Sequence, residues 1–437
     1  MALTFEWMVK QLRATFASLP DYRPGQNTTY AIQDAAVGAF SVFFMQSPSF
    51  LAHQRDLQRK QGRNNAASLF GVEQIPSDPQ IRNLLDPISP DHLRAPYWAI
   101  FAALHDEGHL KQHVGHANTV LIALDGTYYF SSQKIHCDNC TVHTHGEQTR
   151  YSHAAVTPVL VAPGQNTVIP LEPEFILPQD GIEKQDCEQQ AVKRWLARNA
   201  VRFAPWSVTI LTDDLHSHQP FCSLLRQHQC NFILTCKPDS HPPLYSEIEL
   251  LDKIDGVAQL SVGQFNGRFS EVWQCRYVNQ LPLRSGEDAL FVNWCEVRIV
   301  RKQTGELLYH NAFITNHPLT DQTVQPLLRS GRTRWKIENE NNNVLKNYGY
   351  HLEHNFGHGQ QYLSALLVML NLLAFLVHTV LSLSSLKYQR LRHELGPRRT
   401  FFDDLRTLTR YLFFPSWDHL LDFMLTQLEL QPAPDSS

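Results

Sequence analysis

The sequence lacks an excess of basic residues, the compositional feature that most directly indicates a nucleic-acid partner. Its 437 residues hold 38 Lys and Arg against 42 Asp and Glu, so the formal net charge is −4. Affinity for DNA comes mostly from neutralisation of phosphates by Lys and Arg. A DNA-binding function would therefore require local clusters, and basic residues do gather at 55–63, 329–336 and 387–399. Each cluster is also compatible with a solvated helix face.

Other absences narrow the class of protein further. Eight cysteines in a chain of this length do not indicate a disulfide scaffold. The first residues, MALTFEWMVKQLR, form a charged amphipathic stretch, and we expect no secretory signal there. Residues 1–100 contain no nucleotide-binding glycine loop, and no helix-turn-helix is distinct enough to name. With 43% hydrophobic and 18% charged residues, the composition is that of a soluble globular protein with two or three domains.

Long hydrophobic runs are also scarce, since a single stretch at residues 362–383 is long enough to cross a bilayer. That stretch contains Asn371 and His378 and has no second span to partner it. A helix that is apolar on all sides is equally typical of a buried central helix. We expect the buried helix and no membrane, and we keep an integral membrane protein as the alternative.

The hydrophobic pattern predicts an α/β fold. Short apolar runs at 119–124, 208–212 and 231–236 are typical of buried strands and alternate with helical stretches at 184–198 and 217–229. Polar and apolar residues alternate between about 240 and 318, which favours antiparallel strands. We therefore predict a helical N-terminal region (1–118), a first part of an α/β domain (119–239), a β-rich insertion (240–318), the completion of that domain (319–395), and a helical tail with a disordered end (396–437).

Three acidic residues form the strongest candidate site. Asp125 follows the run TVLIAL, Asp213 follows VTILT, and Glu338 lies on a predicted helix beyond the β-rich segment. Side chains at strand ends are held by the sheet yet reach solvent, where α/β folds place their chemistry. Carboxylates that converge need cations, and two Mg²⁺ ions, or Mn²⁺ in their place, suit hard oxygen ligands and phosphoryl transfer. Taken singly, each acid is better explained as a turn or helix-capping residue, and it is the order Asp, Asp, Glu on strand, strand and helix that favours a common site.

At these residues the chain resembles the DDE transposases of bacterial insertion sequences. The matching stretches are IALDGT, ILTDDLHSHQPFC and RWKIENENNNVLKNYGYHLEHNFGHG, and the resemblance runs from about residue 30 to 385. It is similar to the branch with a β-rich insertion between the second Asp and the Glu. The resemblance implies a ribonuclease-H-like mixed sheet flanked by helices. It also implies metal-dependent DNA strand cleavage, followed by transfer of the freed 3′-hydroxyl into target DNA.

Carried over residue by residue, the resemblance makes Asp125, Asp213 and Glu338 the catalytic metal ligands. Members of this branch often carry Tyr, Arg, Glu and Lys at fixed spacing around the Glu. Arg334 precedes Glu338 by four positions, so the two can pair on one helix face. Asp214 is a supporting candidate or a cap. The sequence departs from the pattern at two places, because Gly331 stands at the Tyr position, and Leu345 at the Lys position with Lys346 after it.

The resemblance also implies partners. We expect double-stranded DNA, both transposon ends and target, bound by a homodimer in the cytoplasm of a prokaryote in association with the nucleoid. The candidate DNA-binding residues are Arg332, Lys336, Arg390 and Arg392. The N-terminal region is the candidate for end recognition. The competing hypothesis, motivated by Gly331 and Leu345, is a catalytically degenerate relative that binds DNA without cutting it.

A Cys- and His-rich segment is the second candidate site. Cys137 and Cys140 have the CxxC spacing of zinc ligands. With His143 and His145 they are the candidate set for a structural zinc ion, against the alternative of reduced thiols in a loop. Further histidines lie near, at 136 and 153, and others follow the Glu338 helix at 351, 354 and 358, where the sequence leaves open a DNA contact or a helix cap.

Overall fold

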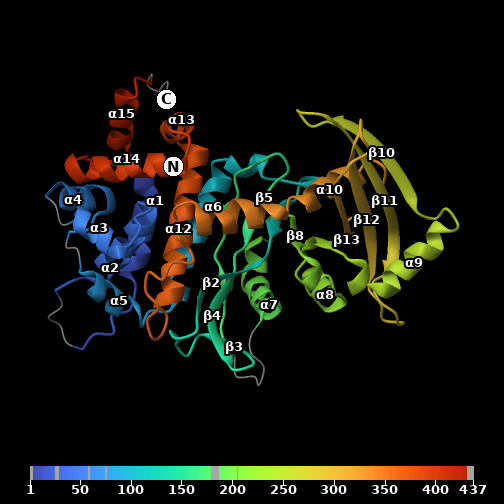
Figure 1. Ribbon diagram of the computed structural model, residues 1–437, viewed down its shortest axis with the longest axis horizontal. Helices are drawn as coiled ribbons and strands as arrows, with labels where there is room; N and C mark the ends of the chain where they lie inside the picture. The colour runs from blue at the N-terminus through green and yellow to red at the C-terminus, as the bar shows by residue number, and fades with distance from the viewer. Residues whose placement is uncertain are drawn as a thin grey trace.

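A mixed β-sheet runs through the molecule and a bundle of helices covers one end of it (Figure 1). The computed structural model describes residues 3–24, 29–57, 60–73, 76–178, 187–203 and 205–430. The mixed α/β class predicted from the sequence is confirmed. The end of the tail that we predict to be disordered, residues 431–437, lies outside the described residues, as do residues 184–186 of the predicted helix 184–198.

In the part of the chain that the structure describes, the main sheet has nine strands in the order β10-β11-β12-β13-β9-β8-β1-β5-β6. Strands β1, β8 and β9 are parallel to one another, and every other neighbouring pair is antiparallel. All residues of β1 and β8 are buried, which explains their unbroken apolar runs. The strands are β1 (Val120–Ala123), β5 (Val159–Val161), β6 (Ile169–Pro170), β8 (Val208–Thr212), β9 (Asn231–Thr235), β10 (Ala258–Phe265), β11 (Ser270–Pro282), β12 (Phe291–Arg301) and β13 (Leu307–Thr315).

The β-rich segment predicted at 240–318 does form antiparallel strands, but they do not make a sheet of their own. Strand β13 pairs with β9 through Phe313 opposite Thr235, so β10–β13 continue the main sheet outward (Figure 1). The segment also contains a helix, α9 (Pro242–Asp252), which contacts β11. Pairing with β9 satisfies the backbone groups of an edge that would otherwise be exposed.

A smaller sheet begins directly after Asp125. Its strands run β2-β4-β3, and β7 pairs with the end of β4 at Ala154–Val156, beyond the part that pairs with β3. The end of β4 and strand β7 are buried, whereas most of β3 is exposed. The strands are β2 (Gly126–Ser132), β3 (Thr141–His145), β4 (Gln148–Val156) and β7 (Glu174–Ile176). Two helices cover the sheets nearby, α7 (Glu188–Asn199) against β4 and β7 and α8 (Gln219–Gln227) against β9.

The two ends of the chain form one helical unit. The rings of Phe5 and Trp417 lie 4.8 Å apart, and the Asn65 side chain donates to the Thr409 carbonyl at 2.6 Å. The described residues of the segments predicted separately at 1–118 and 396–437 are therefore packed together beside the sheet (Figure 1). The α-helices are α1 (Phe5–Ala17), α2 (Ile32–Phe44), α3 (Phe50–Leu57), α4 (Lys60–Asn65), α5 (Asp78–Leu85), α6 (Ala95–Asp106), α13 (Leu386–Glu394), α14 (Arg398–Tyr411) and α15 (Trp417–Gln427).

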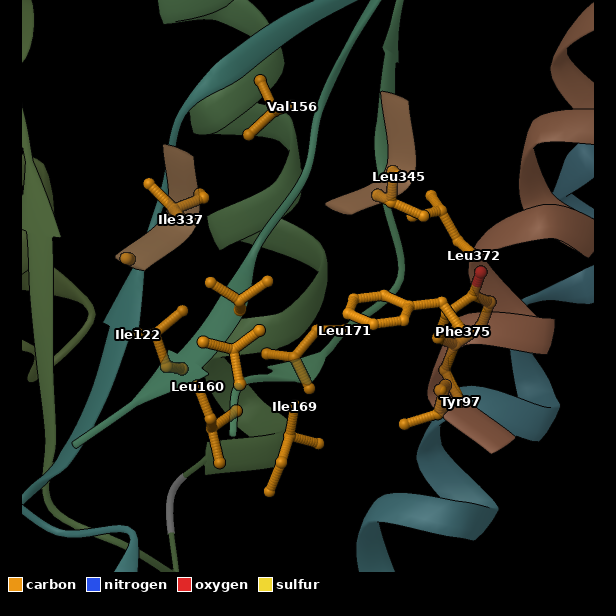
Figure 2. Close-up of a cluster of buried hydrophobic side chains, with 14 of the residues drawn as sticks. Tyr97, Ile122, Val156, Leu160, Ile169, Leu171, Ile337, Leu345, Leu372 and Phe375 are labelled. Carbon is orange, nitrogen blue, oxygen red and sulfur yellow. The ribbon is translucent and has the colours of Figure 1, made fainter. Parts of the chain in front are cut away.

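The long apolar stretch forms α12 (Leu363–Ser384), which joins the helical unit to the sheet. Among the described residues it is the one helix long and apolar enough to cross a membrane, and 89% of its most apolar window is buried inside the protein. Figure 2 shows Phe375 of this helix pointing toward Leu171 and Leu372 lying beside Leu345. The buried position is that of a central core helix, in which each enclosed Leu or Phe side chain contributes about 1.5–3 kcal/mol.

Candidate active site

Asp125 and Asp213 occupy equivalent positions at the ends of two adjacent parallel strands. The β1–β8 register pairs Val120 with Val208, and each aspartate lies five residues beyond its member of that pair. The Leu124 amide donates to the Leu211 carbonyl at 2.9 Å, so the pairing continues to the residue before Asp125. The carboxyl ends of neighbouring parallel strands meet at one sheet edge, and the two carboxylates therefore lie on the same edge.

Glu338 lies near this edge on a helical segment that changes from α-helix to π-helix. Helix α10 (Val324–Arg332) ends six residues before it. A π-helical turn, η8 (Ile337–Asn342), carries Glu338 and leads into α11 (Asn343–Asn347). Ile337 is fully buried while the Glu338 side chain is 52% exposed, so core packing on one side turns Glu338 outward. Such π-turns inside helices occur frequently at functional sites.

A hydrogen-bonded chain connects Asp125 to the Glu338 helix. The Thr157 amide donates to the Asp125 carbonyl at 3.0 Å, and the Thr157 hydroxyl donates to Asn342 Oδ1 at 2.9 Å. The Asn341 side chain donates to the same Asn342 oxygen at 2.9 Å. Thr157 and Asn342 are buried, so this connection is shielded from water. It fixes the third acid relative to the first, and sequence reasoning did not find it.

Burial and nearby negative charge both shift the protonation of Asp125. Burial, together with the charges of Glu188, Glu338 and Asp213, raises the pKa of Asp125 to about 7, against the opposing charge of Arg334. Burial alone would also raise the pKa of Asp213, but hydrogen bonds from His216 and from the Leu215 amide lower it. The two aspartates thus differ in their ease of ionisation although they occupy equivalent strand positions.

Glu188 is a fourth acid at the site that the sequence did not reveal. It is the first residue of α7, and its Oε2 lies so close to Gly126 that a Cβ on residue 126 would be 2.3 Å away. Its Oε1 lies 3.9 Å from Nε2 of the buried His216. Burial raises the pKa of Glu188, the nearby His216 opposes this, and Asp213 adds to it. No local motif marks Glu188, because only the packing of α7 brings it to Asp125.

The donor set fits hard divalent cations. All four groups offer carboxylate oxygens, the ligands that Mg²⁺ and Mn²⁺ prefer. Burial and the neighbouring acids raise the pKa of Asp125 to about 7, and a cation between the acids would stabilise the charged form of this carboxyl. Among the described residues, Asp125, Asp213 and Glu338 do not converge to within 4.8 Å of one another. Unscreened carboxylates repel, and Arg334 holds Glu338 by its own ion pair.

Of the supporting candidates, Arg334 lies where the spacing predicts. Its Nη2 is 2.9 Å from Glu338 Oε1. Lys346 instead pairs with Glu353 at 2.8 Å. Asp214 does not face the other acids, because its Oδ1 accepts the Lys237 amide at 2.7 Å and its Oδ2 accepts the Ser240 hydroxyl. Asp214 is therefore a loop-fixing residue, and its supporting role at the metal site is a correction to the sequence prediction.

The four DNA-binding candidates have different surroundings. Lys336 is a correction, since it is 5% exposed and its ammonium donates to the carbonyls of Ala162, at 2.7 Å, and Gln165. An ammonium buried in this way fixes a loop and does not face DNA. Arg332 lies over the ring of Tyr309 and Arg392 over that of Phe401, both half-buried. Arg390 is exposed on α13.

Both departures from the transposase pattern fall on packing positions. A Cβ at Gly331 would lie 2.8 Å from Ile233 Cγ2 and 3.1 Å from the Phe313 ring, so a tyrosine cannot fit between α10 and the sheet. Leu345 is fully buried in the core cluster of Figure 2. A lysine there would place an ammonium among apolar side chains. Local packing therefore accounts for both residues without any reference to catalysis.

The Cys/His candidates divide into two groups. Cys137 and Cys140 do lie together, but His143 and His145 are exposed on β3 and are not part of their cluster. The histidines that join the cysteines are His153, on β4, and His358, before α12. The β3–β4 register places His143 opposite Arg150, away from His153, which explains the error. Nothing in the local spacing could have selected His358, which is 218 residues from Cys140.

The comparisons with known proteins find a likeness in structure only. No family model matches the sequence, and no curated protein matches it. Among solved structures the chain is similar to the cryo-EM structure of a piggyBac transposase synaptic complex with hairpin DNA. The TM-score is 0.38 at 10% sequence identity, covering 99% of this chain and 83% of that chain. A likeness at this level carries no argument about the chemistry of this chain.

Proposed function

We propose that this protein is a DNA transposase of the DDE type, with Asp125, Asp213 and Glu338 as its metal-binding acids. Under this proposal the sheet is ribonuclease-H-like, the metal is Mg²⁺ or Mn²⁺, and the substrates are double-stranded transposon ends and target DNA. A homodimer in the prokaryotic cytoplasm, associated with the nucleoid, belongs to the same proposal. It rests on the site and on the sequence resemblance.

The observation that carries the proposal is the shared register of Asp125 and Asp213 on adjacent parallel strands. Glu338 is distant in sequence, yet its charge acts on Asp125 together with that of Asp213. Turn or capping roles would explain each acid singly, and Asp213 does accept the Leu215 amide in that manner. They do not explain why the charges of acids from two other segments both act on Asp125.

The residues of the chain supply position and charge. When bound, two divalent ions would activate the attacking oxygen and stabilise the leaving one in phosphoryl transfer. Asp125 and Asp213 would hold these ions from the rigid sheet edge. Arg334 and the Thr157–Asn342 connection would fix Glu338 in direction, and Glu188 would add negative charge. Preorganised groups of this kind avoid the cost of rearrangement during the reaction.

The degenerate-relative hypothesis is the alternative from another functional class. Its motivation was the identity of Gly331 and Leu345, and packing explains both residues. No other observation favours it. It nevertheless makes a distinct prediction, namely DNA binding that persists without metal-dependent cleavage, and one assay separates the two functions.

The test uses supercoiled plasmid carrying this chain's own gene with its native flanking DNA. We expect the full-length protein to nick this plasmid in Mg²⁺ or Mn²⁺ and not in EDTA. Asp125→Asn, Asp213→Asn and Glu338→Gln are each expected to lower nicking by at least about 10³-fold. Glu340→Gln is the matched control, because Glu340 influences Lys336 and not Asp125.

DNA binding is measured in parallel by mobility shift. Retained binding with lost nicking in the three variants, and full nicking in Glu340→Gln, supports the proposal. Binding by wild-type protein with no nicking in either metal contradicts it and selects the degenerate relative. Equal nicking by wild type and by all three variants contradicts it as well, because the acids would then have no role.

A further inference from the structure

Four potential metal ligands converge between the small sheet and the start of α12. Cys137 and Cys140 come from the β2–β3 connection, His153 from β4, and His358 from the segment before α12. Cys140, His153 and His358 are buried and Cys137 is half-buried. One ligand atom from each residue lies within 4.8 Å of every other. These four residues are called the Cys2His2 cluster from here on.

The separations within the Cys2His2 cluster match those around a tetrahedral zinc ion. Zn–S bonds of about 2.3 Å and Zn–N bonds of about 2.0–2.1 Å give tetrahedral edges of about 3.8 Å (S to S), 3.5 Å (S to N) and 3.3 Å (N to N). The Cys137 and Cys140 sulfurs are 3.9 Å apart. The His153 Nε2 lies 3.6 Å from the first sulfur and 3.4 Å from the second. The His358 Nε2 lies 3.4 Å from the Cys140 sulfur and 3.2 Å from the His153 Nε2.

The surroundings orient the ligands as in known zinc sites. His358 Nδ1 donates to the Gly359 carbonyl at 3.0 Å, which leaves its Nε2 lone pair directed at the cluster. The Cys140 amide donates to the Cys137 carbonyl at 3.1 Å, so the two cysteines share a tight turn. Asn139, inside that turn, donates to the Gln361 carbonyl at 2.7 Å. The turn is thus held against the segment that supplies His358.

A disulfide bond and a metal-free hydrogen-bonded cluster both fit this geometry less well. A disulfide needs sulfurs about 2.05 Å apart, far below the observed 3.9 Å. Thiols and imidazoles linked only by hydrogen bonds would have too few protons. The proton of the neutral His358 ring is on Nδ1, which donates it to the Gly359 carbonyl outside the cluster. The two sulfurs and two Nε2 atoms that face one another would therefore have to share the few protons that remain. A single cation at the centre satisfies all four atoms.

We propose that the Cys2His2 cluster binds one structural Zn²⁺ ion. The set of four protein ligands is closed, with no open coordination position, as in structural and not catalytic zinc sites. The ion joins three segments: the β2–β3 connection, strand β4, and the chain that runs from the Glu338 helix into α12. It therefore fixes the small sheet, which begins at Asp125, to the segment that follows Glu338. The inference does not depend on the proposed transposase function.

The test measures zinc in the full-length protein and in three kinds of variant. After purification and washing with excess Mg²⁺, we expect elemental mass spectrometry to find about one zinc ion per chain. Cys140→Ser and His358→Ala are expected to contain at least about fivefold less zinc per chain. Cys187→Ser, which changes an exposed cysteine outside the cluster, is expected to keep it. Asp125→Asn is also expected to keep it, which separates this site from the acidic one.

A second measurement needs no variant and so avoids the risk of misfolding. Zinc is removed and Co²⁺ alone is added to the wild-type chain. We expect the visible ligand-field bands and the sulfur-to-cobalt charge-transfer band of a tetrahedral Cys2His2 site, lost on addition of Zn²⁺. Folded wild-type protein with less than about 0.2 zinc per chain and no tetrahedral cobalt spectrum overturns the proposal. Zinc retained at wild-type level in both Cys140→Ser and His358→Ala overturns it too.

Discussion

The guanidinium of Arg334 lies 2.9 Å from the carboxylate of Glu338, across the start of the π-helical turn. The Arg334 side chain is 21% exposed and that of Glu338 is 52% exposed, so solvent weakens the pair's contribution to stability. Arg334 also acts on Asp125 and Asp213, where its charge favours the ionised acids. One arginine therefore influences all three proposed metal ligands.

Replacement of Arg334 separates its effect on activity from its effect on stability. We expect Arg334→Ala to lower plasmid nicking by about 10²-fold, because Glu338 loses its fixed direction and the acids lose a balancing charge. The free energy of unfolding should change by less than about 1 kcal/mol. Initial nicking rates and denaturant unfolding measure the two quantities. Arg334→Lys keeps the charge and should retain part of the activity; unchanged nicking in Arg334→Ala would contradict the role.

Asp125 should make the metal-free protein less stable as pH rises. Its folded pKa of about 7 exceeds the ordinary value of 3.8, so between these values the folded state holds a proton that the unfolded state has released. Stability is therefore lost as pH rises through this window, and the loss is complete above about pH 7. Asp125→Asn should remove the loss and be more stable than wild type at pH 8 by about 1–3 kcal/mol, since solvent access reduces the full effect.

Chemical unfolding in EDTA at pH 4 and pH 8 tests this prediction. The two proteins should have similar stability at pH 4, apart from the change of side chain. Added Mg²⁺ should stabilise wild type at pH 8 and leave Asp125→Asn nearly unaffected, because a ligand stabilises only the form that binds it. A variant less stable than wild type at pH 8 would contradict the charge repulsion inferred at Asp125.

Glu188 should affect metal binding through its charge. After burial, it is the largest cause that raises the pKa of Asp125. Glu188→Gln should therefore lower that pKa and move the pH midpoint of Mn²⁺ binding downward. Mn²⁺ titrations between pH 5 and pH 8 measure the midpoint, with Glu340→Gln as the control of equal charge change. An identical midpoint in wild type and Glu188→Gln would exclude Glu188 from the site.

The Thr157 hydroxyl should matter more for activity than its size suggests. Thr157→Val keeps the shape but removes the hydrogen bond to Asn342, and we expect a loss of stability of about 1 kcal/mol. Nicking should fall further than stability, because the Glu338 helix is then less firmly tied to the Asp125 strand. Thr157→Ser keeps the hydroxyl and is the control. Equal activity of the Val and Ser variants would contradict a positioning role.

Gly331 tests whether packing accounts for the missing tyrosine. A Cβ there would lie 2.8 Å from Ile233 and 3.1 Å from Phe313, which are both buried in the sheet. Gly331→Ala should cost about 1–3 kcal/mol, and Gly331→Tyr should prevent stable folding. Thermal melts measure both. Ser330→Ala, one residue earlier on the same helix, is the comparison for loss of side-chain hydrogen bonds without overpacking, because the Ser330 hydroxyl donates to the Pro326 carbonyl and accepts from the His116 amide. A stable, active Gly331→Tyr protein would contradict the steric exclusion inferred here.

Local patterns predicted the strands of the site but not all of its members. The unbroken apolar runs before Asp125 and Asp213 predicted β1 and β8 correctly, because strands buried on both faces need such runs. The spacing of Arg334 and Glu338 predicted their ion pair. Glu188 and Thr157 had no such signal, since their places depend on how α7 packs against β4 and β7 and on how the β4–β5 connection bonds to Asp125. Tertiary contacts decide such positions, and local spacing does not contain them.

The errors have the same physical origin. Lys336 was predicted to bind DNA because it lies in a basic cluster, but the fold buries it against the Ala162 carbonyl. His143 and His145 were preferred to His153 because they are nearer to Cys140 in sequence. The alternation of side chains along β3 and β4, and the approach of His358 from the far part of the chain, decide which histidines meet the cysteines.

The packing of the two chain ends on each other has a consequence for synthesis. Asn65 bonds to the carbonyl of Thr409, 344 residues later, and Phe5 stacks near Trp417. A nascent chain emerges N-terminus first, so the faces of α1 and α4 that pack on α15 and α14 stay uncovered until those C-terminal helices have been made. These faces would expose hydrophobic surface for the whole time that the sheet is being made. We expect chaperones to bind that surface during translation and the protein to become resistant to protease only late in its synthesis.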